Sequence, residues 1–208
     1  MKTVLSYLLL GILWCLHCLP LPMLRGLGWA LGHLLYALGR ERREVALVNL
    51  RLCFPQRTEA ERKEIARKHF VAFSRAVLDR TLGWWASKER IERLVRVTGR
   101  EHLHDASGRP ILILAPHFVG LDAGAVRISI FGRACSVFSN QKNPVFNKLL
   151  YEGRRRFSDV LLLSRQDGMR KIVRAMKDGY PLYYLPDMDF GPEDSIFVPF
   201  FGVQAATI

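Results

Sequence analysis

Cysteine and acidic residues are scarce in this chain of 208 residues. Four cysteines are too few and too scattered for a disulfide framework, which excludes a small disulfide-stapled scaffold and favours a reduced cytosolic compartment. The 19 Asp and Glu residues are outnumbered by 31 Lys and Arg, so the net charge is +12 and the pI is near 10. We therefore expect an anionic partner. The candidates are an acidic membrane surface, an acidic protein and nucleic acid. No internal repeat or low-complexity segment is present, and the length suggests one domain.

Charged residues are absent from residues 3–24. This run is long enough to cross a bilayer, although Pro20 and Pro22 predict that its helix ends near Leu19. A second apolar run, residues 26–38, is too short to span and is expected in the interface or in a re-entrant hairpin with the first. A cleaved signal peptide is the alternative, but the apolar region is long and lacks a small-x-small cleavage site. We predict a retained membrane anchor at residues 1–39 and a separate domain at 40–208.

Residues 40–100 carry 16 Arg or Lys against 8 Asp or Glu, and this excess predicts that everything after the anchor lies in the cytoplasm. Thr58 and Glu61 form a capping box that begins a long helix. Its basic side could meet anionic lipid headgroups or an acidic partner. Its apolar face is predicted to consist of Ile65, His69, Phe70, Phe73, Ala76 and Val77.

The rest of the chain alternates between strand and helix patterns, which predicts an α/β fold with a mainly parallel central sheet and flanking helices. A short helix is predicted at 88–94. Strands are expected at 93–98, 111–115, 135–139, 160–163, 182–185 and 196–200. Helices are expected at 122–130, 144–156 and 168–177, the last with Met169, Ile172, Val173 and Met176 inward. Because the chain stops at Ile208 directly after an apolar run, we expect the domain to continue beyond it.

The residues with the clearest chemical pattern follow the strand that begins at Ile111. His117 is predicted on the turn that leaves a buried strand, and Asp122 in the first turn of the next helix, with Gly120 allowing the bend between them. The carboxyl end of a strand is where open α/β sheets place their chemistry. A histidine held by a carboxylate is a general base. The alternative is a core histidine near a helix-capping aspartate. Since the motif contains no serine or cysteine, the nucleophile would be a hydroxyl of the substrate.

Three further groups are candidates, each with a purely structural alternative. Asn143-Pro144 begins a helix that ends in three arginines, Arg154 to Arg156, which either hold a phosphate or carboxylate or complement the helix dipole. Asp187 and Asp189 either bind a metal with a nucleotide sugar, as in glycosyltransferases, or form a turn. The run 196–202 is apolar enough to line an acyl pocket, or it is part of the core.

Taken together, several segments resemble the lipid A biosynthesis acyltransferases, the late lauroyl or myristoyl group of Gram-negative bacteria. The match runs in order through the apolar N-terminus, 49–55, the His117-x4-Asp122 motif, 143–156, 184–191, and 197–202 with 205–207. Many late acyltransferases carry glutamate where this chain has Asp122. The resemblance implies a fold like that of the glycerol-phosphate acyltransferases and a place at the bacterial inner membrane, with the catalytic domain on the cytoplasmic side.

The resemblance also implies transfer of a fatty acyl chain from acyl-carrier protein to a hydroxyl of a lipid A precursor, without a cofactor or metal. His117 and Asp122 would be catalytic. Arg156, with Arg154 second, would hold an anionic group of the acceptor, and Asn143, Asp187 and Asp189 would line the substrate site. The basic surface would meet acyl-carrier protein and anionic inner-membrane lipids. The alternatives are another lysolipid or glycerol phosphate as acceptor, a metal-dependent glycosyltransferase, and a non-enzymatic basic protein. No signature of a nucleic-acid-binding fold is present.

Overall fold

A computed structural model describes residues 2–103, 108–188 and 195–207 of the chain. These residues form two compact units. The first unit comprises Met1–Cys18 and Asp79–Leu185, and the second comprises Leu19–Leu78 and Pro186–Ile208. The long helix α4 (Glu59–Trp85) contributes its first part to the second unit and its last turns to the first. Each unit is described by itself below.

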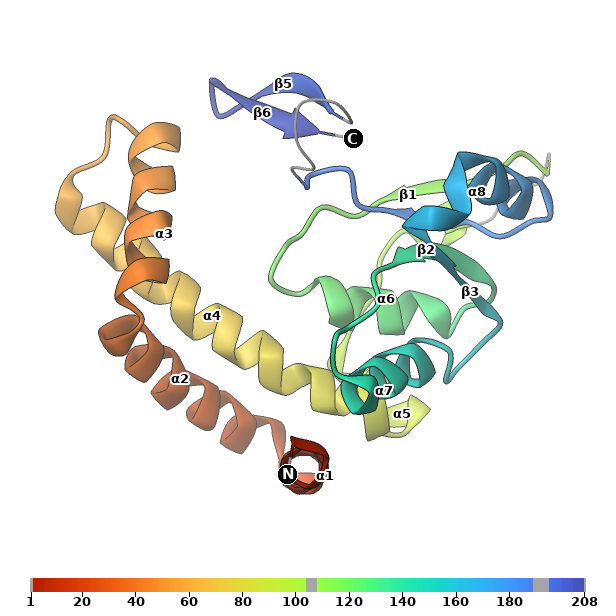
Figure 1. Ribbon diagram of the computed structural model, residues 1–208, viewed down its shortest axis with the longest axis horizontal. Helices are drawn as coiled ribbons and strands as arrows, with labels where there is room; N and C mark the ends of the chain where they lie inside the picture. The colour runs from red at the N-terminus through yellow and green to blue at the C-terminus, as the bar shows by residue number, and fades with distance from the viewer. Residues whose placement is uncertain (1, 104–107, 189–194, 208) are drawn as a thin grey trace. The chain divides into compact units, whose positions relative to one another are not determined.

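The first unit is built on a four-stranded parallel sheet in the order β1-β4-β2-β3. Helices connect the strands, and Figure 1 shows α8 on one face of the sheet and α6 with α7 on the other. The predicted α/β fold with a parallel sheet is thereby confirmed. The elements of the sheet layer are β1 (Leu112–Leu114), α6 (Leu121–Ser129), β2 (Ala134–Phe138), α7 (Pro144–Arg154), β3 (Val160–Ser164), η2 (Arg165–Asp167), α8 (Gly168–Lys177) and β4 (Leu182–Tyr184). The remaining elements are α1 (Lys2–Cys18), α5 (Lys88–Leu94) and η1 (Arg100–Leu103).

The core of the first unit lies between α8 and the sheet. It consists of five buried residues from α8 and three of the strands: Cys135, Leu163, Ile172, Ala175 and Leu182. Burial raises the pKa of the Cys135 thiol to about 11. Ile172 and Met176 point inward as predicted, but Met169 and Val173 are exposed. The contact between α8 and the sheet is centred on Ile172 and Ala175, so the buried stripe runs through positions three and four apart from Ile172.

Two strand predictions need correction. Residues 93–98 form no strand, because α5 continues to Leu94 and the Val95 amide still donates to the Ile91 carbonyl. The strand β1 forms where predicted, but Leu112 and Leu114 are 51% and 64% exposed. The reason is that β1 is an edge strand, so it pairs on one side only and is less enclosed than a central strand.

The second unit joins α2 (Leu21–Leu38), α3 (Arg40–Cys53) and the first part of α4. The helices α2 and α4 of this unit approach each other at two glycines of α2, Gly28 and Gly32. A Cβ added to Gly32 would lie 2.4 Å from the Val71 Cα atom, and one added to Gly28 would lie 2.6 Å from the Arg75 Cγ atom. Only a residue without a side chain permits helix backbones to come so close.

This contact corrects the predicted face of α4. The residues that are buried lie on a stripe through Ala66, Val71, Ser74 and Leu78, whereas Phe73, predicted to face inward, is exposed. Gly28 and Gly32 bring the backbone of α2 against this side of α4, at Arg75 and Val71, and so determine which face is covered. The capping box of α4 is confirmed, with Glu61 N donating to Thr58 Oγ1 and Thr58 N donating to Glu61 Oε2.

A hairpin completes the second unit. The strands β5 (Ile196–Phe200) and β6 (Val203–Thr207) pair antiparallel, so β5 is not a member of the parallel sheet. The turn residues Phe201 and Gly202 both have positive φ, at 51° and 78°, which is the geometry of a two-residue type I′ turn. The sequence analysis missed β6 because Gln204-Ala205-Ala206 lacks the β-branched and aromatic residues typical of strands.

Of the helices in the described part of the chain, none has both the length and the hydrophobicity needed to cross a bilayer; α1, for instance, has 17 residues.

Candidate functional site

His117 lies in the loop that connects β1 to α6 in the first unit, at the carboxyl end of the strand, as the sequence predicts. Its side chain is exposed. The loop is shaped by two close backbone contacts, Phe118 N to Pro116 O at 2.6 Å and Leu121 N to Phe118 O at 3.0 Å. The bend does not need a glycine, since Gly120 has a φ of −86°, which any residue adopts. The loop presents an imidazole at the edge of the sheet where ligands of α/β proteins bind.

Asp122 is the second residue of α6, where a carboxylate is favoured by the partial positive charge of the helix N-terminus. Its carboxylate is bound by two arginines from other elements. Arg80 of α4 donates from Nε to Oδ2 at 2.5 Å, and Nη2 of Arg154 lies 3.8 Å from Oδ1. About a third of the Asp122 side chain is exposed, at 32%. The predicted contact between the Asp122 carboxylate and the His117 imidazole stays a prediction.

Arg154 is the last residue of α7 and contacts both a carboxylate and an aromatic ring. Besides its ion pair with Asp122, its guanidinium carbon is 5.5 Å from the centroid of the Phe138 ring, at the carboxyl end of β2. Burial lowers the pKa of Arg154, and the Asp122 carboxylate partly offsets this. A guanidinium withdrawn from water in this way gains more from an anion than an exposed one does.

Tyr183 joins this group from β4. Its hydroxyl donates to the Leu121 carbonyl at 3.3 Å, which ties the middle of β4 to the first turn of α6. Burial, with a smaller contribution from the Asp122 carboxylate, raises the pKa of Tyr183 to about 12. The phenol is therefore neutral at physiological pH and acts there as a hydrogen-bond donor.

Two of the predicted substrate-binding residues make contacts within the protein. Asn143 caps α7, with Oδ1 accepting from the Val145 and Phe146 amides at 3.0 and 3.4 Å, while Nδ2 donates to Ser6 Oγ of α1 at 2.9 Å. Arg156 donates from Nη1 to the Gly83 carbonyl and from Nη2 to the Ala86 carbonyl, each at 2.8 Å. These carbonyls belong to the end of α4, so the guanidinium satisfies acceptors that the helix leaves open.

The two remaining predicted residues belong to the second unit by sequence. Asp187 follows β4, within Pro186–Ile208, and Asp189 lies outside the described residues. In the described part of the chain no three His, Cys, Asp or Glu side chains gather in a way that could hold a metal ion.

The sequence analysis missed Arg80 and Tyr183. A signal for Arg80 was present, because Asp79-Arg80-Thr81 interrupts an otherwise apolar stretch of α4 from Ala76 to Trp85. Charged residues in such a stretch require partners, and those partners mark a functional or structural network. No local signal marks Tyr183, since a tyrosine in a strand is ordinary.

Fold and site together define an α/β protein whose parallel sheet carries, near its carboxyl edge, an exposed histidine, a carboxylate and two guanidinium groups, at the edge where open α/β sheets bind their ligands. The comparison with known families identifies it further. The family of bacterial lipid A biosynthesis acyltransferases matches residues 1–208, and the chain belongs to this family. The resemblance stated from the sequence is thereby confirmed.

Individual relatives agree. The chain is 35% identical over 206 residues to the lipid A biosynthesis lauroyltransferase of Escherichia coli (strain K12), covering 98% of this chain and 67% of that protein. It is 36% identical over 190 residues to the lipid A biosynthesis myristoyltransferase of the same strain, covering 90% of this chain and 57% of that protein. A lipid A biosynthesis acyltransferase of Haemophilus influenzae is 33% identical over 190 residues, covering 89% and 60%. The chain thus spans between about half and two thirds of the length of these relatives.

Proposed function

We propose that this protein transfers a fatty acyl chain from acyl-carrier protein to a hydroxyl of a lipid A precursor. The observation that carries the proposal is the family match over residues 1–208 together with the position of His117 at the carboxyl end of β1. Two of the relatives named above are a lauroyltransferase and a myristoyltransferase of lipid A biosynthesis, which supports a fatty acyl group as the one transferred.

In the proposed reaction His117 is the general base. Its imidazole takes the proton from the acceptor hydroxyl, whose oxygen attacks the thioester carbonyl of the acyl donor. The tetrahedral intermediate then collapses, the carbon–sulfur bond breaks, and the imidazolium returns the proton to the departing thiolate. The new ester and the free thiol of the carrier protein are the products, so protons balance without a cofactor. Such general-base catalysis contributes about 10²–10⁴-fold to the rate.

Asp122 is proposed to stabilise the imidazolium that forms during attack. Arg80 and Arg154 support this role, because their contacts with the carboxylate fix its position. Arg80 acts here as a positioning residue, since its guanidinium acts through the carboxylate.

Arg154 is the arginine that we assign to the anionic group of the acceptor. Its side chain is partly withdrawn from water beside Asp122, whereas the donors of Arg156 are directed to the carbonyls at the end of α4. Arg156 would then help to hold α7 against α4, and Asn143 would set the start of α7. Asp187 and Asp189 are proposed to shape the substrate site from the segment after β4.

We further propose that the protein works at the cytoplasmic side of the bacterial inner membrane, attached through residues 1–39, with catalysis in 40–208. The pattern of α1 supports attachment: the buried Ser6 faces the α7 cap, while Leu5, Leu8 and Ile12 are each about 60% exposed. A helix that turns its leucines outward presents an apolar surface of the kind that binds membranes or proteins. The basic composition of the chain would attract anionic lipids and the acidic carrier protein.

The test is His117→Ala in the full-length protein, assayed for transfer from acylated carrier protein to a lipid A precursor. Turnover should fall by at least about 10²-fold, while thermal unfolding and binding to vesicles stay unchanged. Near-normal turnover would refute the catalytic assignment. Lipid analysis of cells with and without the gene distinguishes a lipid A precursor from another lysolipid or glycerol phosphate acceptor. Loss of activity in EDTA would instead favour a metal-dependent glycosyltransferase built on Asp187 and Asp189.

A further inference from the structure

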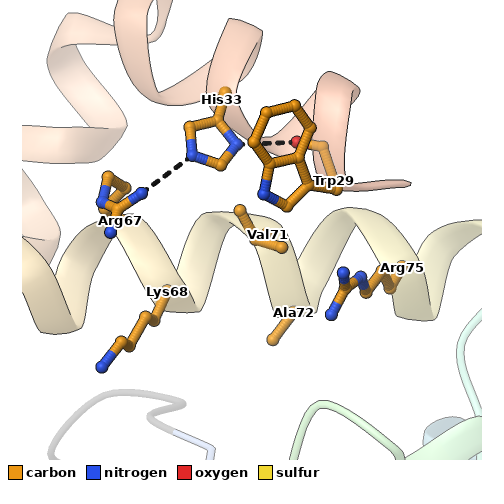
Figure 2. A pocket seen from close by; sticks show the side chains of 7 residues that line it. All are labelled: Trp29, His33, Arg67, Lys68, Val71, Ala72 and Arg75. Carbon is orange, nitrogen blue, oxygen red and sulfur yellow. Dashed lines mark hydrogen bonds between the residues drawn. The ribbon is translucent and has the colours of Figure 1, made fainter. Parts of the chain in front are cut away.

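A pocket of about 270 Å³ lies between α2 and α4 in the second unit. Figure 2 shows Trp29 and His33 on α2 facing α4, where Arg67 extends toward His33, whereas the Lys68 side chain points away from α2. The volume lies near the lower limit of small-molecule pockets in proteins, about 300 Å³. No residue of the proposed acyl-transfer site takes part in it.

Two residues that line the pocket, Val71 and Arg75, are also the ones that the glycines of α2 approach. Gly32 lies against Val71 and Gly28 against Arg75, so the backbone of α2 passes close to α4 beside the pocket.

His33 holds Arg67 at the rim in a defined way. Nη1 of Arg67 lies 2.9 Å from Nε2 of His33, and Nδ1 of His33 lies 2.9 Å from the Trp29 carbonyl oxygen (Figure 2). Because a guanidinium only donates, Nε2 must accept, so the proton of the neutral imidazole is on Nδ1 and is donated to Trp29. The histidine is thus a fixed acceptor for one nitrogen of Arg67.

The pocket has an excess of positive charge. Arg67, Lys68 and Arg75 supply three cations. The neighbouring Glu64 accepts from both Nε and Nη2 of Arg67, the latter at 2.7 Å, and lies 3.5 Å from Lys68 Nζ. Arg75 Nε donates to the Arg25 carbonyl at 3.2 Å, and its two terminal nitrogens have no partner within the described residues. A planar guanidinium with two parallel donors available is the group best matched to a phosphate.

The surroundings favour a phosphate that belongs to a lipid. Trp29 is 52% exposed at the edge of the pocket, and tryptophan is enriched at the level of membrane headgroups. Further along α2, Leu34 and Leu38 are 53% and 73% exposed, so this helix also presents apolar side chains outward. A helix of this kind lies in the interface with its apolar side chains among acyl chains and its cationic neighbours at the phosphates. A soluble phosphate would make no contact with the exposed tryptophan and leucines.

We propose that the pocket between α2 and α4 binds the phosphate of an anionic lipid headgroup and so fixes how the second unit sits on the membrane. Arg75 binds the phosphate oxygens through its two terminal nitrogens, Arg67 and Lys68 add positive charge beside it, and Trp29 contacts the glycerol or upper acyl region. The inference takes from the proposed function only that the protein works at a membrane, and it does not depend on the acyl-transfer chemistry.

The first experiment compares two double variants of the full chain that change the net charge equally. Arg67→Gln with Arg75→Gln removes the free donors of Arg75 and the charge of Arg67 but retains the Arg75 Cγ atom that lies against Gly28, and Arg42→Gln with Lys63→Gln removes two exposed cations outside the pocket. Binding is measured with vesicles of phosphatidylcholine alone and of phosphatidylcholine with phosphatidylglycerol. The control pair should lose only the general attraction of two cations, about fivefold for each. The pocket pair should weaken binding to the anionic vesicles at least about tenfold more.

Equal losses in the two double variants would overturn the proposal, because only net charge would then matter. A second comparison leaves all existing contacts in place: Ala72→Glu puts a carboxylate into the pocket, and Ala72→Gln adds the same bulk without charge. The glutamate variant should lose at least about tenfold more binding to anionic vesicles than the glutamine variant. Indistinguishable binding by these two variants would also refute the site.

Inorganic phosphate distinguishes the source of the ligand. A thermal shift caused by phosphate at constant ionic strength, lost in the Arg67 and Arg75 pair, but without any preference for anionic vesicles, would assign the pocket to a soluble phosphate and overturn the lipid assignment. His117→Ala should bind anionic vesicles as the unaltered chain does. Failure of the catalytic assignment and failure of the lipid site therefore give different results.

Discussion

The two units are stabilised by different kinds of packing. The first unit encloses an apolar core between α8 and a parallel sheet, and its polar network of Asp122, Arg80 and Arg154 lies at the strand ends, away from that core. In the second unit the helices α2 and α4 touch through glycine, and the charged residues lie in ion pairs along the helices. In the first unit, the hydrophobic core leaves the strand ends available for chemistry. In the second unit, helices that pack through their backbones turn apolar and cationic side chains outward.

The largest expected effect is on catalytic activity, and it comes from the polar network of the first unit. Arg80→Gln should lower kcat at least tenfold and change KM little, because it removes a charge-assisted contact that fixes Asp122. Arg80→Lys should retain part of the activity, since charge remains while the fixed geometry of the guanidinium is lost. The control is Arg155→Gln, whose guanidinium contacts the hydroxyl of Tyr151. Steady-state kinetics with the lipid acceptor measures both parameters. An unchanged kcat for Arg80→Gln would show that the network is structural only.

The second prediction concerns the backbone contact of the second unit. Gly32→Ala should reduce the free energy of unfolding by about 1–3 kcal/mol, because the new methyl group would overlap the backbone of Val71 and the helices must move apart. Gly26→Ala is the matched control in the same helix. Nothing lies within 4 Å of a Cβ at that position, so this change should stabilise the helix by about 0.5–1 kcal/mol. Chemical unfolding monitored by circular dichroism measures both.

The corresponding glycine of the first unit sharpens the comparison. A Cβ at Gly153 would lie 2.6 Å from Cδ1 of Trp84, which is a side-chain atom and can shift more easily than backbone. We expect Gly153→Ala to cost less than Gly32→Ala. If the order is reversed, the second unit does not depend on close backbone packing more than the first does.

The third prediction concerns helix caps. Thr58→Ala should cost about 1 kcal/mol, because it removes the hydroxyl that accepts from Glu61 N and donates to the Glu61 carboxylate. Ser87→Ala removes a single cap contact to Arg90 N at the start of α5 in the first unit. Thermal unfolding should show a greater loss for Thr58→Ala than for Ser87→Ala. Equal losses would mean that the reciprocal capping box adds nothing to a simple cap.

The fourth prediction concerns the pH dependence of stability. Its effect at neutral pH is the smallest, but at high and at low pH it differs between the two units. The Tyr183 phenol in the first unit has a pKa raised to about 12 by burial, so its contribution is complete below the ordinary value near 10 and is lost as the pH rises to 12. Hydrogen bonds from Arg51 and then from Arg62 lower the pKa of Glu59 in the second unit to about 2. Its contribution is complete above about 4.5 and is lost as the pH falls to 2.

Variants test this assignment. Tyr183→Phe should flatten the alkaline decline of the melting temperature and leave the acid decline unchanged. Glu59→Gln should do the opposite. A Tyr183→Phe protein that still loses stability between pH 10 and 12 to the same extent would show that another group controls the alkaline limit.

Local patterns predicted much of the first unit. The short apolar runs at 111–115, 160–163 and 182–185 predicted three strands, and the helices between 122 and 177 were placed to within two residues of their observed ends. Such segments are predictable because turn residues, caps and apolar spacing all lie within a few positions of one another. Position alone also placed His117 after a strand and Asp122 at a helix start, since both facts follow from the same local pattern.

Contacts between distant residues could not be predicted in this way. The partners of Asp122 come from positions 80 and 154, and those of Arg156 from 83 and 86, which no spacing rule connects. The inward face of α4 was predicted as the aromatic side, but the glycines of α2 select the side with small residues. The strand β6 was missed because pairing with β5 across a tight turn outweighs its weak strand propensity.

By itself, the sequence determined the α/β alternation, the basic character, the family, and the order of the histidine and the aspartate along the chain, because these depend on composition and on neighbours within one turn or strand. Only the tertiary structure decided which guanidinium groups contact Asp122, which face of α4 is buried, and that cations and a tryptophan share a pocket between α2 and α4. These features arise from residues that are tens of positions apart in the sequence and meet only when the chain folds. Which of them meet depends on the packing of the whole unit, which no short segment contains.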